Sequence, residues 1–274
     1  MTKADRALRE VRRHTFDRVA ERYATARPGY PNAVFDAIET VVPPPARVLE
    51  IGPGPGQATL PLAERGYSVI GVELGRNMAR VARRRLAAYP NVQIVRADFH
   101  DWRPSIPGSF DLVLAASAFH WIDDEIGLAA VSRALRANGW LALLWNHTVR
   151  GPARSRSRTF WDRTDELYRG HAPSLVPYDG RAERRELDRR AEIRRGGLFH
   201  PAQRRSWRWR RQFSAEEYVQ LLDTYSDHLA MPADQRGRLY DSLRELIDGS
   251  FRGVVVREYL TVLYLAQARR PAAK

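Results

Sequence analysis

The chain has 274 residues, of which 44% are hydrophobic and 10% aromatic, enough to bury a sizeable core in one elaborated domain. It contains no cysteine, which excludes disulfides, a thiolate nucleophile and cysteine-ligated metal clusters, and its seven histidines lack metal-ligand spacing, so we expect no metal site. The formal net charge of +13 at pH 7 is compatible with a nucleic-acid surface, a solvated charged surface or a pocket for an anionic small molecule.

The N-terminal sequence MTKADRALREVRRH is charged and has no adjoining apolar stretch. No apolar run elsewhere approaches the length of a membrane span. We therefore expect neither a signal peptide nor a transmembrane helix, and a cytoplasmic protein without membrane contact.

Short apolar runs alternate with amphipathic segments through the first 150 residues. The apolar runs predict five strands, at 46–51, 67–73, 92–98, 110–117 and 140–146. The segments between them predict helices at 57–66, 76–89 and 125–139, of which the first and last are stopped by glycine. Strands and helices that alternate at this pace indicate a parallel sheet with helices on both faces.

The pattern changes after Asn146. Residues 151–200 are polar, rich in arginine and helical in pattern, and 205–213 alternate like a strand. Two helical segments follow at 214–229 and 233–249, and an apolar run at 253–268 closes the chain. We interpret this region as a helical insertion, a sixth strand, two further cap helices and a final edge strand of the same sheet.

The sequence VLEIGPGPGQATL at 48–60 places a glycine-rich loop between the first strand and the first helix. In open parallel sheets such loops hold ligands beyond the carboxyl ends of the strands. A dinucleotide fingerprint would need glycine at position 57, where Gln57 stands, and Pro53 and Pro55 remove two of the N–H donors that a pyrophosphate requires. The loop is therefore poorly suited to phosphate.

Two acidic residues, Glu50 and Glu73, end the first two predicted strands. They are unfavourable neighbours for a polyanion. Glu73 can accept two hydrogen bonds from a ribose diol, whereas Glu50 suits a ligand with an ammonium and a sulfonium group. This combination describes S-adenosylmethionine, which carries adenosine without a phosphate.

Several motifs resemble those of class I S-adenosylmethionine-dependent methyltransferases: VLEIGPGPGQAT with the acidic residue that follows it, ADF at 97–99, FDLVLAASAFHWID at 110–123 and ALRANGWLALLWN at 134–146. FDRVAERYATARPGYP at 16–31 and LLDTYSDHLAMP at 221–232 are similar to the small-molecule branch, which includes trans-aconitate methyltransferase-like and natural-product enzymes. The resemblance covers residues 16–150 well and the C-terminal third loosely.

The resemblance implies a fold class and a division of the chain. The fold is expected to be α/β, with a Rossmann-like, seven-stranded, mostly parallel sheet, helices on both faces and a helical cap. The expected parts are an N-terminal helical lid at 1–40, a cofactor-binding core at 41–150, and a cap insertion with the final strands at 151–274. The N-terminal helix is also a candidate contact for a homo-oligomer.

The resemblance also implies which residues bind the cofactor. The glycines let the loop pass under the methionine part, whose ammonium Glu50 organises, and Glu73 holds the ribose hydroxyls. The implied set is Tyr23, Arg27, Glu50, Gly52, Gly54, Gly56, Glu73, Leu74, Asp98, Phe99, Ala115 and Ser117.

The remaining residues of this set have separate roles by the same resemblance. Leu74 lies against adenine, Asp98 accepts from the adenine amino group, and the backbone N–H of Phe99 donates to a ring nitrogen. Ala115 and Ser117 line the methionine and methyl end. Tyr23 and Arg27 belong to a segment that folds over the cofactor, where Arg27 can pair with its carboxylate.

Methyl transfer from a sulfonium is an in-line displacement, for which the protein supplies alignment and excludes water. A base is needed only where the nucleophile must lose a proton. His120, after the fourth strand, is the candidate for that role. The alternative is a histidine that orients backbone or packs beside Trp121.

The sequence thus predicts a methyltransferase that acts on a small molecule, in bacterial secondary metabolism. An RNA or DNA methyltransferase is the alternative, favoured by the charge and by RRSWRWRR at 204–211. Against it, SAFH at 117–120 replaces the motif of amino-directed base methylases, and acidic residues interleave the arginines at 181–195. A cofactor-binding protein without transferase activity, or a relative that performs a cyclisation, is a third possibility.

Overall fold

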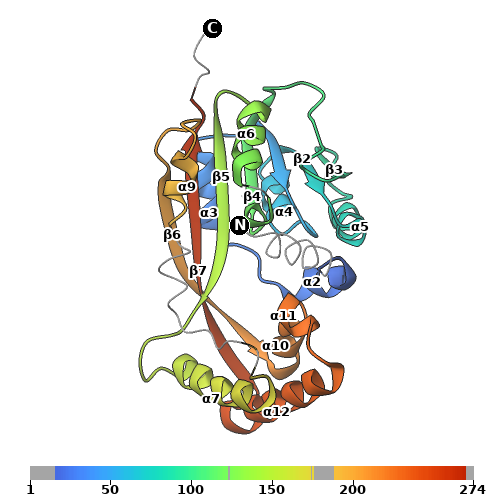
Figure 1. The fold of residues 1–274 in the computed structure, drawn as a ribbon, viewed down its shortest axis with the longest axis vertical. Helices are drawn as coiled ribbons and strands as arrows, with labels where there is room; N and C mark the ends of the chain where they lie inside the picture. The colour runs from blue at the N-terminus through green and yellow to red at the C-terminus, as the bar shows by residue number, and fades with distance from the viewer. Residues whose placement is uncertain (1–15, 123, 174, 176–187, 270–274) are drawn as a thin grey trace.

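A computed structural model of the chain describes residues 16–122, 124–173, 175 and 188–269. Its strands form a seven-stranded sheet in the order β3-β2-β1-β4-β5-β7-β6 (Figure 1). Strands β1 to β5 are parallel, whereas β7 is antiparallel to both β5 and β6, so the mostly parallel sheet is confirmed. The strands are β1 Arg47–Ile51, β2 Ser68–Glu73, β3 Val92–Arg96, β4 Phe110–Ala116, β5 Leu135–Val149, β6 Gln203–Ser214 and β7 Val254–Gln267.

Helices connect and flank these strands. None in the described part of the chain is long and apolar enough to cross a bilayer. They are η1 Phe16–Val19, α2 Ala20–Ala26, α3 Asn32–Glu39, α4 Thr59–Glu64, α5 Arg76–Arg85, η2 Phe119–Trp121, α6 Asp124–Ala134, α7 Arg156–His171, α9 Arg190–Arg194, α10 Ala215–Leu222, α11 Ser226–Leu229 and α12 Ala233–Phe251.

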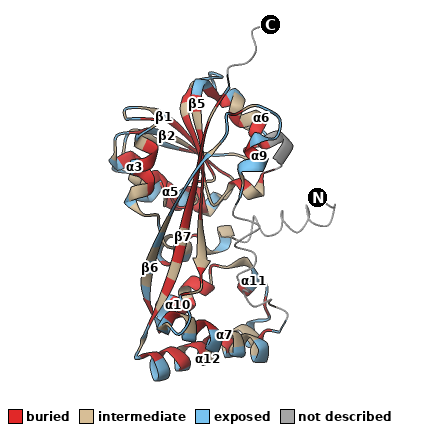
Figure 2. Ribbon diagram, turned by 90° about the vertical axis from the view of Figure 1, so that its left-hand side faces the viewer, coloured by how far each residue is buried: buried red, intermediate tan, exposed pale blue. Residues whose placement is uncertain are grey.

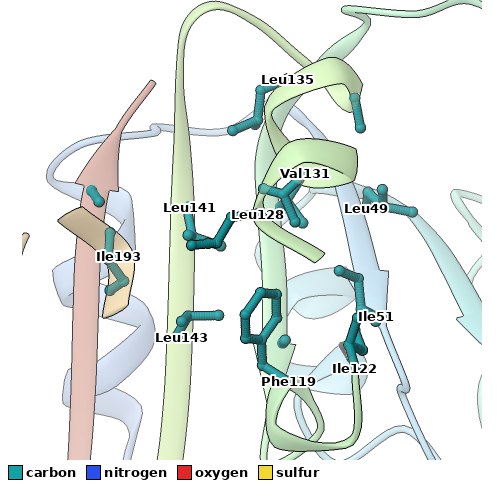
Figure 3. Close-up of a cluster of buried hydrophobic side chains, with 14 of the residues drawn as sticks. Leu49, Ile51, Phe119, Ile122, Leu128, Val131, Leu135, Leu141, Leu143 and Ile193 are labelled. Atoms are coloured by element: carbon teal, nitrogen blue, oxygen red, sulfur yellow. The ribbon is translucent and has the colours of Figure 1, made fainter. Parts of the chain in front are cut away.

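Apolar side chains on both faces of the sheet are buried under helices, because successive residues of a strand point to opposite faces. On one face, Leu128 and Val131 of α6 pack toward Leu49 of β1 and Leu141 of β5 (Figure 3). On the other face, α3 and α4 cover residues such as Val48. The sheet is therefore a rigid platform whose carboxyl edge can hold a ligand.

The third predicted helix ends five residues earlier than expected. Residues 125–139 were predicted to be helical, but α6 ends at Ala134 and the next residue, Leu135, already pairs with Phe110 of β4. A Cβ at Gly139 would lie 3.1 Å from the carbonyl oxygen of Phe110, so glycine here permits a close approach of strands rather than stopping a helix.

The prediction of a final edge strand is wrong. β7 lies between β5 and β6, and its residues are buried along most of their length (Figure 2). A strand with apolar residues on both faces needs neighbours on both sides. β6 is the edge strand instead, and its exposed Arg208 and Arg210 keep that edge polar.

The long strands β6 and β7 extend beyond the rest of the sheet to a group of helices (Figure 1). Helices α7, α10 and α12 pack there around a second apolar core that includes Phe160, Tyr218 and Leu243. Ser214 and Glu217 form a capping box that begins α10 directly after β6. We refer to α7, α10, α11 and α12 as the helical unit, and we propose it as the predicted cap.

The N-terminal segment divides into two parts of different character. Helix α3, within the predicted 1–40 lid, is a core helix, because Val34, Phe35 and Ile38 are fully buried against the sheet. Residues 16–31 instead cross from α5 to the helical unit. The predicted lid is therefore proposed for this shorter segment, and the N-terminal helix predicted as an oligomer contact lies largely outside the described residues.

Candidate active site

A cavity of about 390 Å³ opens at the carboxyl edge of the sheet. The loops that follow β1, β2, β3 and β4 form one side, and residues of segment 16–31, β5, β7 and the helical unit form the other. This is the edge at which open parallel sheets bind ligands. Its size is that of a small-molecule site.

The glycine-rich loop forms the floor of this cavity. Gly52, Gly54 and Gly56 have φ values of +63°, +56° and +91°, a region that L-residues rarely adopt. A Cβ at Gly52 would lie 2.8 Å from that of Ala118, and a Cβ at Gly54 would enter open space. Gly56 is outside the cavity lining and packs against Leu86, so it shapes the loop without facing a ligand.

Glu50, at the end of β1, is fully buried beside this loop. Its Oε2 accepts a hydrogen bond of 2.7 Å from Thr59, whereas its Oε1 is buried and has no hydrogen-bond partner in the described part of the chain. Burial, with a smaller contribution from Glu73, raises the pKa of Glu50 to about 7. An orphaned buried oxygen on a carboxyl that lines a cavity fits a ligand with a cationic donor.

Glu73, at the end of β2, connects two backbone segments. Its Oε2 accepts from the N–H of Gly54 at 2.9 Å, and its Oε1 accepts from that of Gly75 at 2.7 Å. Leu74 lines the cavity beside it. Each carboxylate oxygen has two lone pairs, so the same group can also accept from ligand hydroxyls.

Asp98 and Phe99 follow β3 and line the cavity. Asp98 Oδ1 accepts from the backbone N–H of His100 at 2.9 Å and lies 2.9 Å from Nδ1 of the same histidine. The ring of Phe99 stacks on Trp102, with centroids 6.5 Å apart. These contacts fix both residues at the part of the cavity formed by the loop after β3.

The end of β4 requires one correction. Ala115 was predicted to line the cavity, but its side chain is fully buried in the core on the opposite face, and Ala116 lines the cavity instead. The alternation of side chains along a strand explains the difference. Ser117 does line the cavity, with a φ of 54° and its Oγ 3.1 Å from the hydroxyl of Tyr30.

His120 also lines the cavity, and its Nδ1 accepts a hydrogen bond of 3.3 Å from the indole N–H of Trp145. A neutral imidazole that accepts at Nδ1 carries its proton on Nε2. In this arrangement the neutral ring of His120 has its acceptor nitrogen, Nδ1, occupied by Trp145 and its donor at Nε2. It can act as a base only after the bond to Trp145 breaks.

Segment 16–31 contacts the far sides of the cavity. Asp17 accepts from the backbone N–H groups of Asn77 and Met78 at 2.7 and 2.9 Å, which caps α5. Arg27 donates to the side chain and carbonyl of Thr224 at 2.7 and 3.0 Å, next to the helical unit. Tyr23 and Arg27, which were predicted to bind the cofactor, both line the cavity.

The donor and acceptor pattern fits the expected ligand. Glu50 offers a buried acceptor for an ammonium group, Glu73 for a ribose diol and Asp98 for an amino group, while Pro53 and Pro55 leave few loop donors for phosphate. The described residues contain no group of three or more acidic or histidine side chains that could hold a metal ion.

Several lining residues beyond the first four strands are absent from the predicted set. Thr148, Tyr225 and Tyr259 line the cavity, and the predicted set includes none of them. The signal that was present is the period of two in β7, where Arg257, Tyr259 and Thr261 stand at every second position of an otherwise mostly apolar strand, with Glu258 and Leu260 between them. Such a pattern marks one polar face on an otherwise buried strand.

Comparison with known proteins gives one family. Residues 49–143 match a methyltransferase domain family. An uncharacterised methyltransferase of Mycobacterium tuberculosis is 30% identical over 226 residues, which are 82% of each chain.

Solved structures agree in fold. A protein of Anaeromyxobacter dehalogenans, proposed to be a type II methyltransferase, is 26% identical with a TM-score of 0.59, over 89% of this chain and 97% of that one. A phosphoethanolamine N-methyltransferase of Haemonchus contortus, solved with phosphomonomethylethanolamine and S-adenosylhomocysteine, has a TM-score of 0.52 at 17% identity, over 93% of this chain and 58% of that one. The second comparison concerns the fold alone.

Partial matches extend to enzymes with different substrates. A trans-aconitate 2-methyltransferase of Azoarcus is 37% identical over 101 residues, 36% of this chain and 38% of that protein. A probable ribosomal RNA methyltransferase of Methanopyrus kandleri is 46% identical over 68 residues, 25% of this chain and 24% of that protein. These matches leave the substrate undetermined.

Proposed function

The chain belongs to the class I S-adenosylmethionine-dependent methyltransferases, and we propose that it methylates a small molecule held in the cavity at the carboxyl edge of the sheet. The observation that carries the proposal is the position of the cavity between segment 16–31 and the helical unit. Segment 16–31 contributes side chains to its lining, among them Tyr23 and Arg27, and the connection between α10 and α11 contributes Tyr225. A site built in this way has room for a small acceptor and excludes water from it.

The proposed cofactor contacts follow the order of the strands. When bound, S-adenosylmethionine supplies an electrophilic methyl group on its sulfonium. Glu50 holds the ammonium through Oε1, the backbone of Gly52 and Gly54 passes beneath the methionine part, and Glu73 accepts from the ribose. Asp98 and Phe99 bind the adenine. These residues orient the sulfonium toward the part of the cavity that is lined by Ser117 and by residues that follow it in the sequence.

The proposed acceptor side contains Tyr30, Ser117, His120, Trp145 and Asn146. The hydrogen bond from Trp145 leaves Nε2 of His120 as a donor in the neutral ring, which favours positioning an acceptor oxygen or nitrogen. Alignment of the acceptor with the methyl group then contributes more to the rate than proton removal does, and a general base is optional.

The indoles of β6 argue against the nucleic-acid alternative. Trp209 donates its Nε1–H to Thr261 at 2.7 Å and stacks on Tyr259 with centroids 4.7 Å apart, and Trp207 packs partly on the main core. Neither ring is then a free platform on which a base can stack. The exposed Arg208 and Arg210 remain as a charged edge.

Labelled cofactor distinguishes the candidate functions. The purified protein is incubated with labelled S-adenosylmethionine and either total RNA or a small-molecule extract, at physiological ionic strength. We expect label in the extract, and only weak RNA binding that disappears with salt, at a log-log slope of about −0.7 per phosphate contact on single strands. RNA methylation that persists in salt and falls on changing Arg208, Arg210 and Arg211 to Ala would overturn the proposal. Binding of cofactor without turnover would favour the third possibility.

The pH dependence of cofactor affinity tests Glu50. An ammonium ligand prefers the ionised carboxylate, whose pKa burial raises to about 7 in the free protein. The affinity for the cofactor is therefore highest above that pKa. It falls as the pH drops through the pKa, by about tenfold between pH 8 and pH 6. Calorimetric titration with S-adenosylhomocysteine at several pH values measures this. Glu50→Gln should bind weakly with a flat profile, and exposed Glu64→Gln should match the wild type; an unchanged profile in Glu50→Gln would exclude Glu50.

Hydrogen exchange tests the proposed lid. Residues 16–31 reach across the cavity and are held by Asp17 at α5 and by Arg27 at Thr224. Amide exchange in this segment should slow when S-adenosylhomocysteine binds, because the ligand adds contacts beneath it. Helix α3, which is part of the core, serves as the internal control and should not change. Equal exchange of residues 16–31 with and without ligand would contradict a lid.

A further inference from the structure

Arg257 of β7 is a buried cation without a buried counter-charge. Only 4% of the residue is exposed, and no ion pair among the described residues includes it. Its Nη1 donates to the hydroxyl of Tyr225 at 3.2 Å and its Nη2 to that of Thr148 at 3.1 Å, while its Nε is buried without an acceptor. All its polar contacts are therefore with neutral groups.

Aromatic rings surround this guanidinium. Its Cζ lies 5.1 Å from the ring centroid of Trp161 and 5.5, 6.0 and 5.9 Å from those of Tyr218, Tyr225 and Tyr259. Cation–π contacts offset part of the cost of burying the charge, but that cost is normally met by an acidic partner. Nearby Arg150, by contrast, pairs with Asp165 at 2.6 Å. Of these two neighbouring arginines, Arg150 therefore has an acidic partner, whereas Arg257 has none among the described residues.

The groups around Arg257 connect it to the cavity. Thr148, Tyr225 and Tyr259 all line the cavity, and Thr148 lies opposite Tyr259 in the β5–β7 register. Arg257 is two residues from Tyr259 and therefore on the same face of β7. It lies behind the three hydroxyl-bearing residues, which separate it from the cavity.

The three hydroxyls are available as donors. The oxygens of Thr148 and Tyr225 accept from Arg257, which leaves their own hydrogens for another acceptor. The hydroxyl of Tyr259, a residue 3% exposed, is buried and has no hydrogen-bond partner among the described residues. Three hydroxyl donors beside one buried positive charge are groups that can bind an anion.

The two ends of the cavity thus carry opposite charge. Glu50 and Glu73 lie at the sheet edge proposed for the cationic cofactor, whereas Arg257 lies behind the wall formed by β5, β7 and the helical unit. The polar face of β5 and β7, from Asn146 and Thr261 to Thr148 and Tyr259, joins the two ends.

We propose that the methyl acceptor carries a carboxylate or phosphate group, which binds to the hydroxyls of Thr148, Tyr225 and Tyr259 in front of the buried guanidinium of Arg257. This inference rests on the proposed function, because it names the chemical class of the acceptor for the same cavity. Arg257 is a positioning residue in this arrangement, since it acts through the hydroxyls that it orients and through its charge.

Anion binding to the cofactor-loaded protein tests the proposal without a known substrate. Protein saturated with S-adenosylhomocysteine is titrated with inorganic phosphate, acetate and neutral acetamide by calorimetry, at constant ionic strength to screen surface arginines. We expect one or both anions to bind and acetamide not to. Tighter binding of phosphate indicates a phosphate ester, and tighter binding of acetate a carboxylic acid. Binding of acetamide equal to that of acetate, or of neither anion, would overturn the proposal.

Tyrosine variants of β7 provide a matched pair. Tyr259→Phe removes one hydroxyl and should weaken anion binding about tenfold. Tyr264→Phe removes another buried hydroxyl without a partner from the same strand, outside the cavity, and should bind the anion as the wild type does. Equal anion affinity in the two variants would contradict the site.

Charge variants test Arg257 itself. Arg257→Lys should retain part of the anion affinity that Arg257→Met loses. The unfolding temperature of both variants is measured as well. If neither variant folds, the comparison of Tyr259→Phe with Tyr264→Phe tests the anion site instead. Once an acceptor is known, Tyr259→Phe should raise KM with little change in kcat. Methylation of a neutral small molecule without anion binding would overturn this inference and leave the proposed function intact, whereas salt-resistant methylation of RNA would overturn the proposed function.

Discussion

A Gly54→Val variant is expected to lose S-adenosylhomocysteine binding by at least about 100-fold, or about 2.8 kcal/mol. Gly54 has a φ of +56°, and a Cβ there would enter the open space of the cavity. Branched methyl groups at this position would occupy the volume proposed for the methionine part of the cofactor. Calorimetric titration measures the loss.

Gly66→Val is the matched control for this variant. Gly66 also has a positive φ, of +88°, and open space around its Cβ, but it ends α4 away from the cavity. It shares the backbone strain without the obstruction, so its stability should fall while its cofactor affinity stays unchanged. A Gly54→Val variant that binds as tightly as Gly66→Val would mean that the loop does not hold the cofactor.

Glu73→Ala is expected to weaken cofactor binding by about 1 to 3 kcal/mol, because it removes the acceptor for ribose hydroxyls. The same change leaves the N–H groups of Gly54 and Gly75 without their acceptor, so the glycine-rich loop loses an anchor as well. Titration with S-adenosylhomocysteine measures the loss of cofactor affinity. Thermal unfolding measures the loss of stability that results from the missing anchor.

Glu73→Gln separates these two effects. Its amide oxygen can still accept from one backbone N–H, whereas the loss of the second oxygen and of the charge weakens the contact with ribose. One of the two backbone N–H groups still loses its acceptor, so we expect the stability and the cofactor affinity of Glu73→Gln to lie between those of the wild type and those of Glu73→Ala. Unchanged affinity in both variants would remove Glu73 from the site.

The grouping of the residues proposed to bind the cofactor could be predicted because its signals are local. Apolar runs of five to seven residues define β1, β2 and β4, and the glycines and acids that matter directly follow them. A parallel sheet brings strand ends to one edge, so residues 50, 73 and 98 were expected to lie together. Two members of the predicted set, Gly56 and Ala115, do not line the cavity. For Ala115 the reason is that one residue of register decides which face of the sheet a side chain joins.

The C-terminal third could not be predicted to the same depth because its contacts are distant in sequence. Placing β7 between β5 and β6 depends on pairing such as that of Thr148 with Tyr259, which no local pattern specifies. The apolar content of β7 already argued for a central strand, but chain order suggested an edge. The aromatic cage of Arg257 joins α7, α10 and β7 and becomes visible only in three dimensions.

A crystal structure of the complex with S-adenosylhomocysteine tests the account most directly. We predict the ligand in the cavity at the carboxyl edge, with its ammonium at Glu50, its ribose at Glu73, its adenine between Asp98 and Leu74, and its sulfur facing Ser117 and His120. The space between that sulfur and Tyr259 should remain for the acceptor. A ligand bound elsewhere, or one that fills the cavity as far as Tyr259, would contradict both the cofactor site and the small-molecule assignment.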